Sequence, residues 1–218
     1  MVKISRAGPD TPAAHTPPSH RGLKTGAIIL AAGKSQRMGS PKALLPCPEG
    51  TFIERIIAML KRSRADRITT VLGHEAGRIQ AGADLSAIRV VINEQYELGQ
   101  LSSLQAALRS VPDDTDAILM CLVDQPFVKT ETVDSLIAAF RRTSAPIVLP
   151  TYKGKRGHPV LFARPLFEEL LAAPLDIGAR HVVRTHSECI LDTATSDAGT
   201  AITIHTMADY RRHFGAGV

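Results

Sequence analysis

The sequence predicts an α/β domain with a mostly parallel sheet, helices on both faces and a small antiparallel insertion in its second half. Short apolar runs alternate with helix-length segments between residues 26 and 150, and parallel strands need such long connections. The first apolar run ends in glycine and the fourth reaches an acid, at the strand ends where open α/β sheets bind ligands. With 218 residues, 44% of them hydrophobic, the chain can bury a core without disulfides or a metal.

The elements of the first half follow from hydrophobic periodicity. A buried strand is predicted at 26–33, where the apolar run GAIILAAG enters a glycine turn. A helix is predicted at 51–62, because apolar residues recur there at helical spacing. Thr130 is expected to cap a later helix that has acids in its first turn. The other strands are predicted at 67–73, 88–94, 116–126 and 145–150, and the other helices at 102–111 and 130–142.

The second half departs from this alternation. A strand at 158–163 follows a segment rich in glycine and lysine that resembles a hairpin, which is why an antiparallel insertion is predicted. The remaining elements are predicted as helices at 165–173, 178–186 and 207–214 and strands at 188–193 and 200–205.

Residues 1–24 are predicted to be a disordered tail, and residues 25–218 the single domain. The tail holds several prolines among small polar residues and can bury little apolar surface. It also carries four basic residues against one acid, so most of the formal net charge of +5 comes from it. The rest of the chain is almost balanced and aromatic residues are only 4%. Because nucleic-acid binding needs a clustered basic patch, no nucleic-acid partner is expected.

Cysteine usage and hydropathy predict a cytoplasmic protein. The three cysteines, Cys47, Cys121 and Cys189, are widely spaced and form no CxxC motif, which favours a reducing compartment without a structural zinc site. The longest apolar runs are far shorter than a bilayer span, and the N-terminal residues have no apolar core of a signal peptide. No membrane partner is therefore expected.

The loop after the first predicted strand has the composition of a phosphate-binding loop. It carries Lys34, Arg37 and Lys42 beside Gly33 and Gly39. Its spacing fits neither the Walker A motif nor the GxGxxG dinucleotide motif. Backbone N–H groups that turn inward around an anion can still form a cradle here. Three cations on so short a loop indicate a polyanionic ligand, and a triphosphate fits.

The segment LAAGKSQRMGSPKALLP resembles the LAAGxSxRMGxxKxLLP signature of the MobA-like nucleotidyltransferases. Within that group it is similar to the MocA-type molybdenum cofactor cytidylyltransferases, and NEQYELGQLSSLQAAL, LVDQPFV, KRGHPVLF and DIGARHVV extend the resemblance along the chain. The resemblance implies a Rossmann-like three-layer sandwich of the nucleotide-diphospho-sugar transferase type. It also implies transfer of CMP or GMP to molybdopterin, and LAAG, where guanylyl enzymes tend to have LAGG, favours CTP over GTP.

The resemblance also implies roles for particular residues. Lys42 and Arg37 would neutralise charge as the α-phosphorus is attacked and pyrophosphate leaves. Asp124 would hold Mg²⁺, which prefers oxygen ligands. The nucleotide would be bound by Leu30, Ala31, Ala32, Gly33, Arg37, Lys42, Asn93, Gly99 and Ser103.

The acceptor side and the second metal position are less regular. His158, Asp176 and Arg180 are the candidates for binding the acceptor. The family usually ends with a segment like DIDTPEDY, whereas this chain has TIHTMADY, so that His205 stands at the metal-side position. His205 could act through water or favour a softer metal such as Mn²⁺.

The sequence therefore predicts a nucleotidyltransferase that moves CMP from CTP to molybdopterin with Mg²⁺ and releases pyrophosphate. Two alternatives stay open. The acceptor could be another phosphorylated molecule, such as a sugar phosphate, with GTP or another NTP as donor. The chain could instead be an accessory protein for a molybdoenzyme that has lost catalysis, which His205 favours and which intact Arg37, Lys42 and Asp124 oppose.

Overall fold

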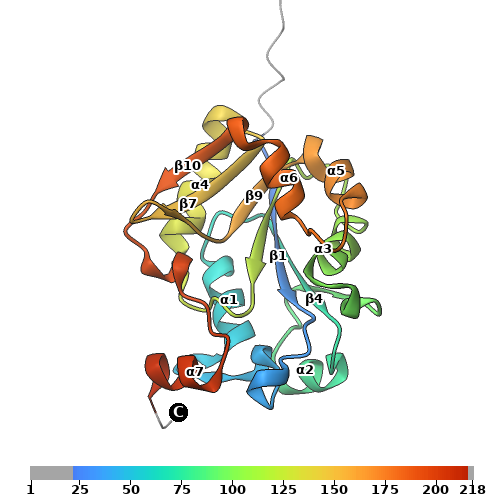
Figure 1. Ribbon diagram of the computed structural model, residues 1–218, viewed down its shortest axis with the longest axis vertical. Coiled ribbons are helices and arrows are strands. Elements are labelled where there is room, and N and C mark those ends of the chain that lie inside the picture. The colour runs from blue at the N-terminus through green and yellow to red at the C-terminus, as the bar shows by residue number, and fades with distance from the viewer. Residues whose placement is uncertain (1–21, 216–218) are drawn as a thin grey trace, which may run out of the picture.

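An eight-stranded sheet forms the centre of the computed structural model, which describes residues 22–215 (Figure 1). Its strands are arranged in the order β10-β7-β9-β6-β1-β4-β5, and β8 pairs with β7 alone. Strand β1 and three further strands are all parallel to one another. They are β1 (Thr25–Ala31), β4 (Arg67–Leu72), β5 (Arg89–Ile92) and β6 (Ala117–Leu122). This confirms the parallel sheet expected from the alternating pattern.

The predicted antiparallel insertion is β9 (Val160–Ala163), which lies between β6 and β7 (Ile147–Tyr152). Strand β9 is antiparallel to both neighbours, so β6 and β7 run in the same direction. Strand β10 (Ile190–Ala194) adds in parallel to β7, and β8 (Lys155–Arg156) closes a short hairpin. The sheet is therefore mixed, and its reversed strands are confined to the second half of the chain.

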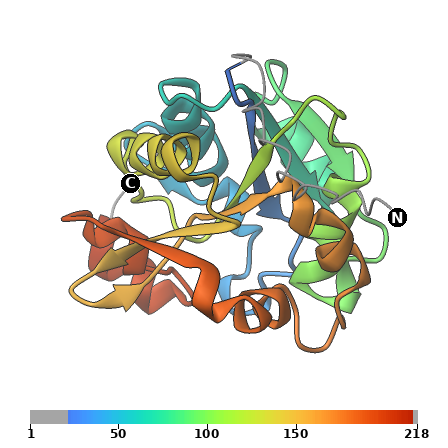
Figure 2. The same ribbon diagram turned by 90° about the horizontal axis from the view of Figure 1, so that it is seen from above.

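Helices cover both faces of the sheet, because successive residues of a strand point to opposite sides. Ala27, Ile29 and Ala31 of β1 pack into one core cluster, and Ile28 and Leu30 into the other. Figure 2 shows the two helical layers on opposite sides of the sheet. The first layer contains α1 (Phe52–Lys61), α2 (Ala76–Gly82) and α4 (Thr130–Thr143), and the second contains α3 (Gln100–Leu108), α5 (Phe167–Ala172) and α6 (Arg180–Thr185).

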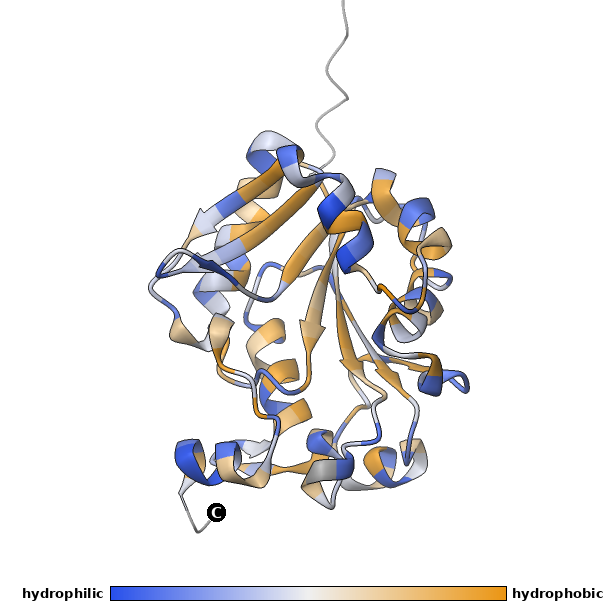
Figure 3. Ribbon diagram, in the orientation of Figure 1, coloured by the Kyte–Doolittle hydropathy of each residue, from blue (hydrophilic) through white to orange (hydrophobic). Residues whose placement is uncertain are grey.

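The described helices are all short. None of those within residues 22–215 is long and apolar enough to cross a membrane. The apolar residues instead concentrate along the strands and on the inner helix faces, as the hydropathy colours show (Figure 3). Six short 3₁₀ turns complete the structure: η1 (Gln36–Met38), η2 (Lys42–Leu44), η3 (Tyr96–Leu98), η4 (Arg164–Leu166), η5 (Ser187–Cys189) and η6 (Ala198–Ala201).

Three local predictions were wrong. Residues 200–205 do not form a strand, because their backbone pairs with loops: Thr200 accepts a bond from the His158 N–H, and the Ile204 N–H donates to the Asp124 carbonyl. Thr130 is the first helical residue rather than the cap, and its hydroxyl donates to the Met59 carbonyl. Helix α3 begins two residues before the predicted start, after Gly99, whose φ of 97° suits glycine.

The C-terminal helix α7 (Met207–Phe214) packs against a hairpin formed by β2 (Pro46–Cys47) and β3 (Gly50–Thr51). The Tyr210 hydroxyl donates to the Pro46 carbonyl at 2.8 Å. Phe52, at the start of α1, is fully buried beneath this helix. The helix therefore supports the end of the molecule that carries the loop after β1 (Figure 1).

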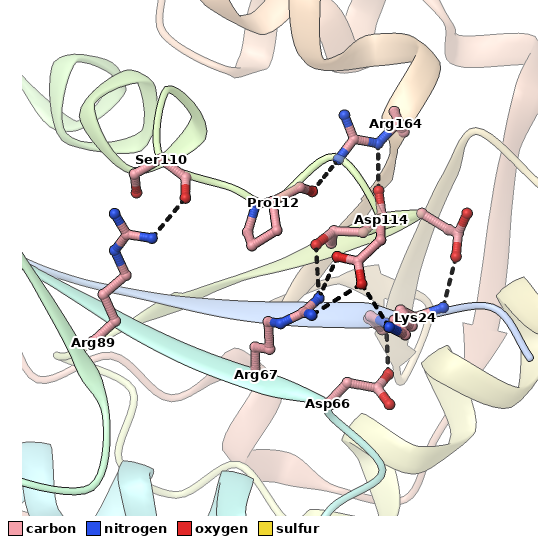
Figure 4. Close-up of polar contacts among 11 residues, drawn as sticks. Lys24, Asp66, Arg67, Arg89, Ser110, Pro112, Asp114 and Arg164 are labelled. Atoms are coloured by element: carbon pink, nitrogen blue, oxygen red, sulfur yellow. Dashed lines mark hydrogen bonds and ion pairs between the residues drawn. The ribbon is translucent and has the colours of Figure 1, made fainter.

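Ion pairs tie together the opposite end of the sheet, where β1, β4 and β6 begin (Figure 4). The Arg67 guanidinium donates to both carboxylate oxygens of Asp114 at 2.8 and 3.0 Å, and the Lys24 ammonium lies 2.5 Å from the same carboxylate. These two cations hold the pKa of Asp114 far below its usual value. Lys24, the last residue of the predicted tail, thus contacts the folded domain, and residues 1–21 of that tail lie outside the described part of the chain.

Gly199 provides a test of how tightly the 197–204 segment is packed. A β-carbon at Gly199 would overlap the Phe127 carbonyl, so Gly199→Ala is expected to destabilise the fold by about 1–3 kcal/mol, as overpacking does. For a chain of this size that lowers Tm by roughly 2–4 °C per kcal/mol.

The matched control is Gly77→Ala, because a β-carbon at Gly77 in α2 meets no atom within 4 Å and alanine favours helices. Calorimetry should find Tm of this control unchanged or slightly raised. Equal Tm values for the two variants would contradict the packing described for Gly199.

Candidate active site

The loop after β1 and the turn after β6 meet at the carboxyl ends of these neighbouring strands. Crossovers from β1 lead first toward β4 and β5, and the chain then returns to β6 on the other side of β1. Such a reversal opens a crevice at the carboxyl edge of a doubly wound sheet. A cavity of about 490 Å³ lies there, which is within the usual range for small-molecule sites.

The loop that follows β1 presents its backbone to this cavity. Ser35 and Gly39 both have left-handed backbone conformations, with φ of 49° and 67°. The Ser35 hydroxyl accepts a hydrogen bond from the Lys42 N–H at 3.0 Å, which fixes both ends of the loop. Gly33 lines the cavity, and a β-carbon there would meet nothing within 4 Å. Open backbone of this kind suits an anionic ligand.

Lys42 and Asp124 form an ion pair inside the cavity. The Lys42 Nζ atom lies 2.9 Å from Asp124 Oδ2, and the two side chains are only 15% and 22% exposed. The structure thus places two predicted catalytic residues, 82 positions apart in sequence, in direct contact. Ammonium and carboxylate at the bottom of one crevice can bind a phosphate and a divalent cation, respectively.

Two side chains in the cavity could hold a metal ion. Asp124 and His205 both line the cavity, and His205 is exposed. Within residues 22–215 no group of three or more His, Cys, Asp or Glu side chains could hold a metal ion.

Most of the predicted nucleotide-binding residues border the cavity. Asn93 is the exception: its buried amide donates to the Ser102 and Ser103 hydroxyls, so it lies behind Ser103. Arg37 lies in η1, and its side chain is not among those that the structure describes. The predicted residues that do line the cavity are Leu30, Ala31, Ala32, Gly33, Lys42, Gly99 and Ser103.

Sequence reasoning missed Tyr96 and Gln100, which also line the cavity. Tyr96 packs against Gly73, where a β-carbon would come within 2.6 Å of the Tyr96 β-carbon. Its hydroxyl lies 3.4 Å from His74 Nδ1. Both missed residues lie within the NEQYELGQ segment. The motif therefore indicated this part of the chain, but it did not show which of its side chains point into the cavity.

An exposed ion pair joins the loop after β1 to η3 beside the cavity. The Lys34 ammonium on the loop lies 2.5 Å from the Glu97 carboxylate in η3. The pKa of Lys34 is raised by this contact and that of Glu97 is lowered. Lys34 thus interacts with protein rather than standing alone as a loop cation, and the pair is screened by solvent.

The structure separates the three residues predicted on the acceptor side. Asp176 is exposed and lines a second cavity of about 270 Å³, which shares Gly99 and Gln100 with the first. Arg180 is exposed at the start of α6. His158 is largely buried at the start of β9, and burial lowers its pKa, although the Asp124 charge and the Met120 carbonyl oppose this shift.

Comparison with known proteins gives a consistent result. The MobA-like NTP transferase domain matches residues 27–189. The molybdenum cofactor cytidylyltransferase of Escherichia coli (strain K12) is 29% identical over 78% of this chain and 91% of its own length. The nicotine blue oxidoreductase of Paenarthrobacter nicotinovorans is 30% identical over 85% of this chain and 94% of its own.

A solved structure shares the architecture. The crystal structure of Rv0371c from Mycobacterium tuberculosis H37Rv superposes with a TM-score of 0.79 at 28% identity, covering 89% of this chain and 99% of that one. Rv0371c in complex with manganese superposes with a TM-score of 0.73 at 25% identity, covering 89% and 100%. The Rossmann-like nucleotidyltransferase fold predicted from the sequence is confirmed.

The low pKa of His158 predicts how stability depends on pH. A buried histidine whose pKa in the folded state lies below the unfolded value of about 6.5 takes up a proton more readily after unfolding. Its contribution is therefore fully present above pH 6.5 and is lost as the pH falls below that value. Urea unfolding between pH 7.5 and 5.5 should show a smaller decrease in the free energy of unfolding for His158→Asn than for wild type. Parallel decreases would contradict the assignment.

Proposed function

Because this chain belongs to the MobA-like NTP transferase family, we propose that it is the nucleotidyltransferase that moves CMP from CTP to molybdopterin or the molybdenum cofactor and releases pyrophosphate. The observation that carries the proposal is the ion pair between Lys42 and Asp124 beside an open glycine loop. A cation for the phosphates and a carboxylate for a divalent ion are thereby held at one point of one cavity.

The proposed reaction is a direct in-line displacement. A phosphate oxygen of the acceptor attacks the α-phosphorus of CTP and forms a new P–O bond, while the bond from that phosphorus to the bridging oxygen of pyrophosphate breaks. The open backbone at Gly33 and the Lys42 ammonium bind the phosphates. A divalent metal, when bound, neutralises charge on the phosphate oxygens. Asp124 and His205 are the side chains that would hold it.

The Lys42 ammonium neutralises the partly buried Asp124 carboxylate. Asp124 would hold a divalent cation, and the Lys42 ammonium would then donate to the phosphates, where negative charge develops as pyrophosphate leaves. Arg37 is proposed to assist there, in keeping with the resemblance of its motif.

The choice of CTP rests on the LAAG segment and on one relative. The LAAG segment agrees with a cytidylyl donor, and the Escherichia coli relative is a cytidylyltransferase. For the acceptor, the cavity beside Asp176 adjoins the nucleotide cavity at Gly99 and Gln100.

One observation supports a second function. The nicotine blue oxidoreductase is as similar to this chain as the cytidylyltransferase is, and one fold can host unrelated chemistries. The Lys42–Asp124 pair offers both a cation for phosphates and a carboxylate for a divalent ion, which is the combination that nucleotidyl transfer uses, so the pair favours that function. Transfer to another phosphorylated acceptor and a non-catalytic accessory role for a molybdoenzyme are further outcomes of the same test.

Pyrophosphate release tests this function directly. Purified protein receives molybdopterin with CTP, GTP, ATP or UTP, and with Mg²⁺ or Mn²⁺. Release is expected with CTP, and Asp124→Ala and Lys42→Ala should each lower it at least 100-fold, since removing one transition-state contact costs about 10²–10³. Arg211→Ala in α7, which does not line the cavity, is the matched control for loss of a cation.

Two results would oppose the proposal. Release with GTP but not CTP would identify a guanylyltransferase. NTP binding without pyrophosphate release for any nucleotide would favour another acceptor, the redox reaction or the accessory role.

His205 makes a separate prediction about metal preference. Imidazole suits softer ions than carboxylate does, so wild type should prefer Mn²⁺ over Mg²⁺, and His205→Asp should shift the ratio of the two dissociation constants toward Mg²⁺ on the order of tenfold. Calorimetric titration in the presence of CTP measures both constants. His181→Asp, on exposed α6, controls for the added negative charge. An identical ratio in both variants would exclude His205 from the metal site.

A further inference from the structure

A small cavity lies directly beneath the turn that carries Asp124. Its volume is about 10 Å³, which is the space that a single water molecule needs. Its walls come from α1, the end of β6, the turn after β6 and the start of β9. The cavity therefore borders both the end of β6 and the turn that carries Asp124.

Two residues that line this cavity each have a buried polar atom without a hydrogen-bond partner among the described residues. The atoms are His158 Nδ1 and Gln125 Oε1. Gln125 is only 6% exposed, and its amide nitrogen already donates to the Thr203 hydroxyl at 2.9 Å. If the amide is turned over, the other amide atom becomes the unpartnered one, so one unpartnered group remains in either orientation. Buried polar groups of this kind are almost always satisfied by protein or by ordered water.

We propose that one ordered water molecule bridges His158 Nδ1 and the Gln125 amide, and that His158 is thereby a positioning residue for the Asp124 turn rather than a contact of the acceptor. The cavity has the size of one water molecule, and it is lined by two residues that each carry an unpartnered buried polar atom, which a water molecule there could satisfy. The bridge would link the start of β9 to the residue that directly follows Asp124 in the chain.

The water bridge would add to hydrogen bonds that already hold the turn. The Ile204 N–H donates to the Asp124 carbonyl at 2.8 Å, and the Thr203 hydroxyl accepts from the Gln125 amide. The backbone N–H of His158 donates to the Thr200 carbonyl of the same segment at 3.2 Å. His158 thus contacts the segment that holds the turn and borders the cavity beneath it.

The positioning role, unlike the water itself, rests on the proposed function, because it assumes that Asp124 holds a divalent cation. Replacing a side chain that orients a metal ligand without touching the metal typically changes metal affinity 10–100-fold. A residue that contacts the acceptor would instead change the KM for the acceptor. These two consequences can be measured separately.

The first experiment is a crystal structure of the wild-type protein at about 1.5 Å resolution. We expect a water peak in the cavity within about 2.7–3.2 Å of His158 Nδ1 and of the Gln125 amide. A cavity without a peak would overturn the proposal. This readout does not depend on any activity, so it stands even if no nucleotide is turned over.

The second experiment measures the Mn²⁺ dissociation constant by electron paramagnetic resonance, in the presence of CTP and without acceptor. His158→Phe, which removes the ring nitrogen, should weaken Mn²⁺ binding about tenfold. His158→Asn, which keeps a polar atom near the Nδ1 position, should restore most of the affinity. His181→Phe on exposed α6 is the matched control, and Tm of each variant verifies folding.

The outcomes separate the two assignments. Weaker Mn²⁺ binding in His158→Phe with recovery in His158→Asn supports the positioning role. Unchanged Mn²⁺ binding in a folded His158→Phe protein overturns it, and a raised acceptor KM in that variant would return His158 to the acceptor site. If wild type binds Mn²⁺ but releases no pyrophosphate, the proposed function fails while the water and the Mn²⁺ readouts still decide this inference.

Discussion

The parallel pairing of β1 with both β4 and β6 is the constraint on which the rest of the site depends. Leu30 is in register with Leu122 on one side and with Val71 on the other. Because parallel strands end at the same edge, this register delivers the loop after β1 and the turn after β6 to a single point. The contact between Lys42 and Asp124 follows from that register, since neither residue is near the other in sequence.

The charges at the two ends of the sheet are used differently. At the amino end, Arg67 and Lys24 surround Asp114 and join the start of β1 to the loop before β6. At the carboxyl end, Lys42 meets Asp124 in a cavity with space for a ligand. The first cluster is mostly satisfied by protein partners and strengthens the fold. In the second, the two charges pair with each other beside a cavity, where the proposed function assigns them to a phosphate and a metal ion.

The segment 197–204, which contains only the short η6, holds several other parts of the structure in place. Buried Asp197 accepts from the Lys129 N–H and the Thr132 hydroxyl, and Gly199 lies against the Phe127 backbone. Ile204 then reaches the Asp124 carbonyl. The turn that carries Asp124 is thus held by residues about 80 positions later, and His205, which directly follows Ile204, lines the cavity.

The sequence by itself determined the fold class, the strand–helix alternation and the family motif in the loop after β1. These features are local: apolar periodicity follows from the geometry of one element, and the loop motif is continuous. Only the tertiary structure decided which polar groups face the ligand. Asn93 turns away to bond Ser102 and Ser103, and His158 lies beneath the turn. Residues 200–205 alternate like a strand, yet loops take their hydrogen bonds. The physical reason is that hydrogen-bond partners are chosen among groups brought together by folding, so a pattern read along one segment cannot identify them.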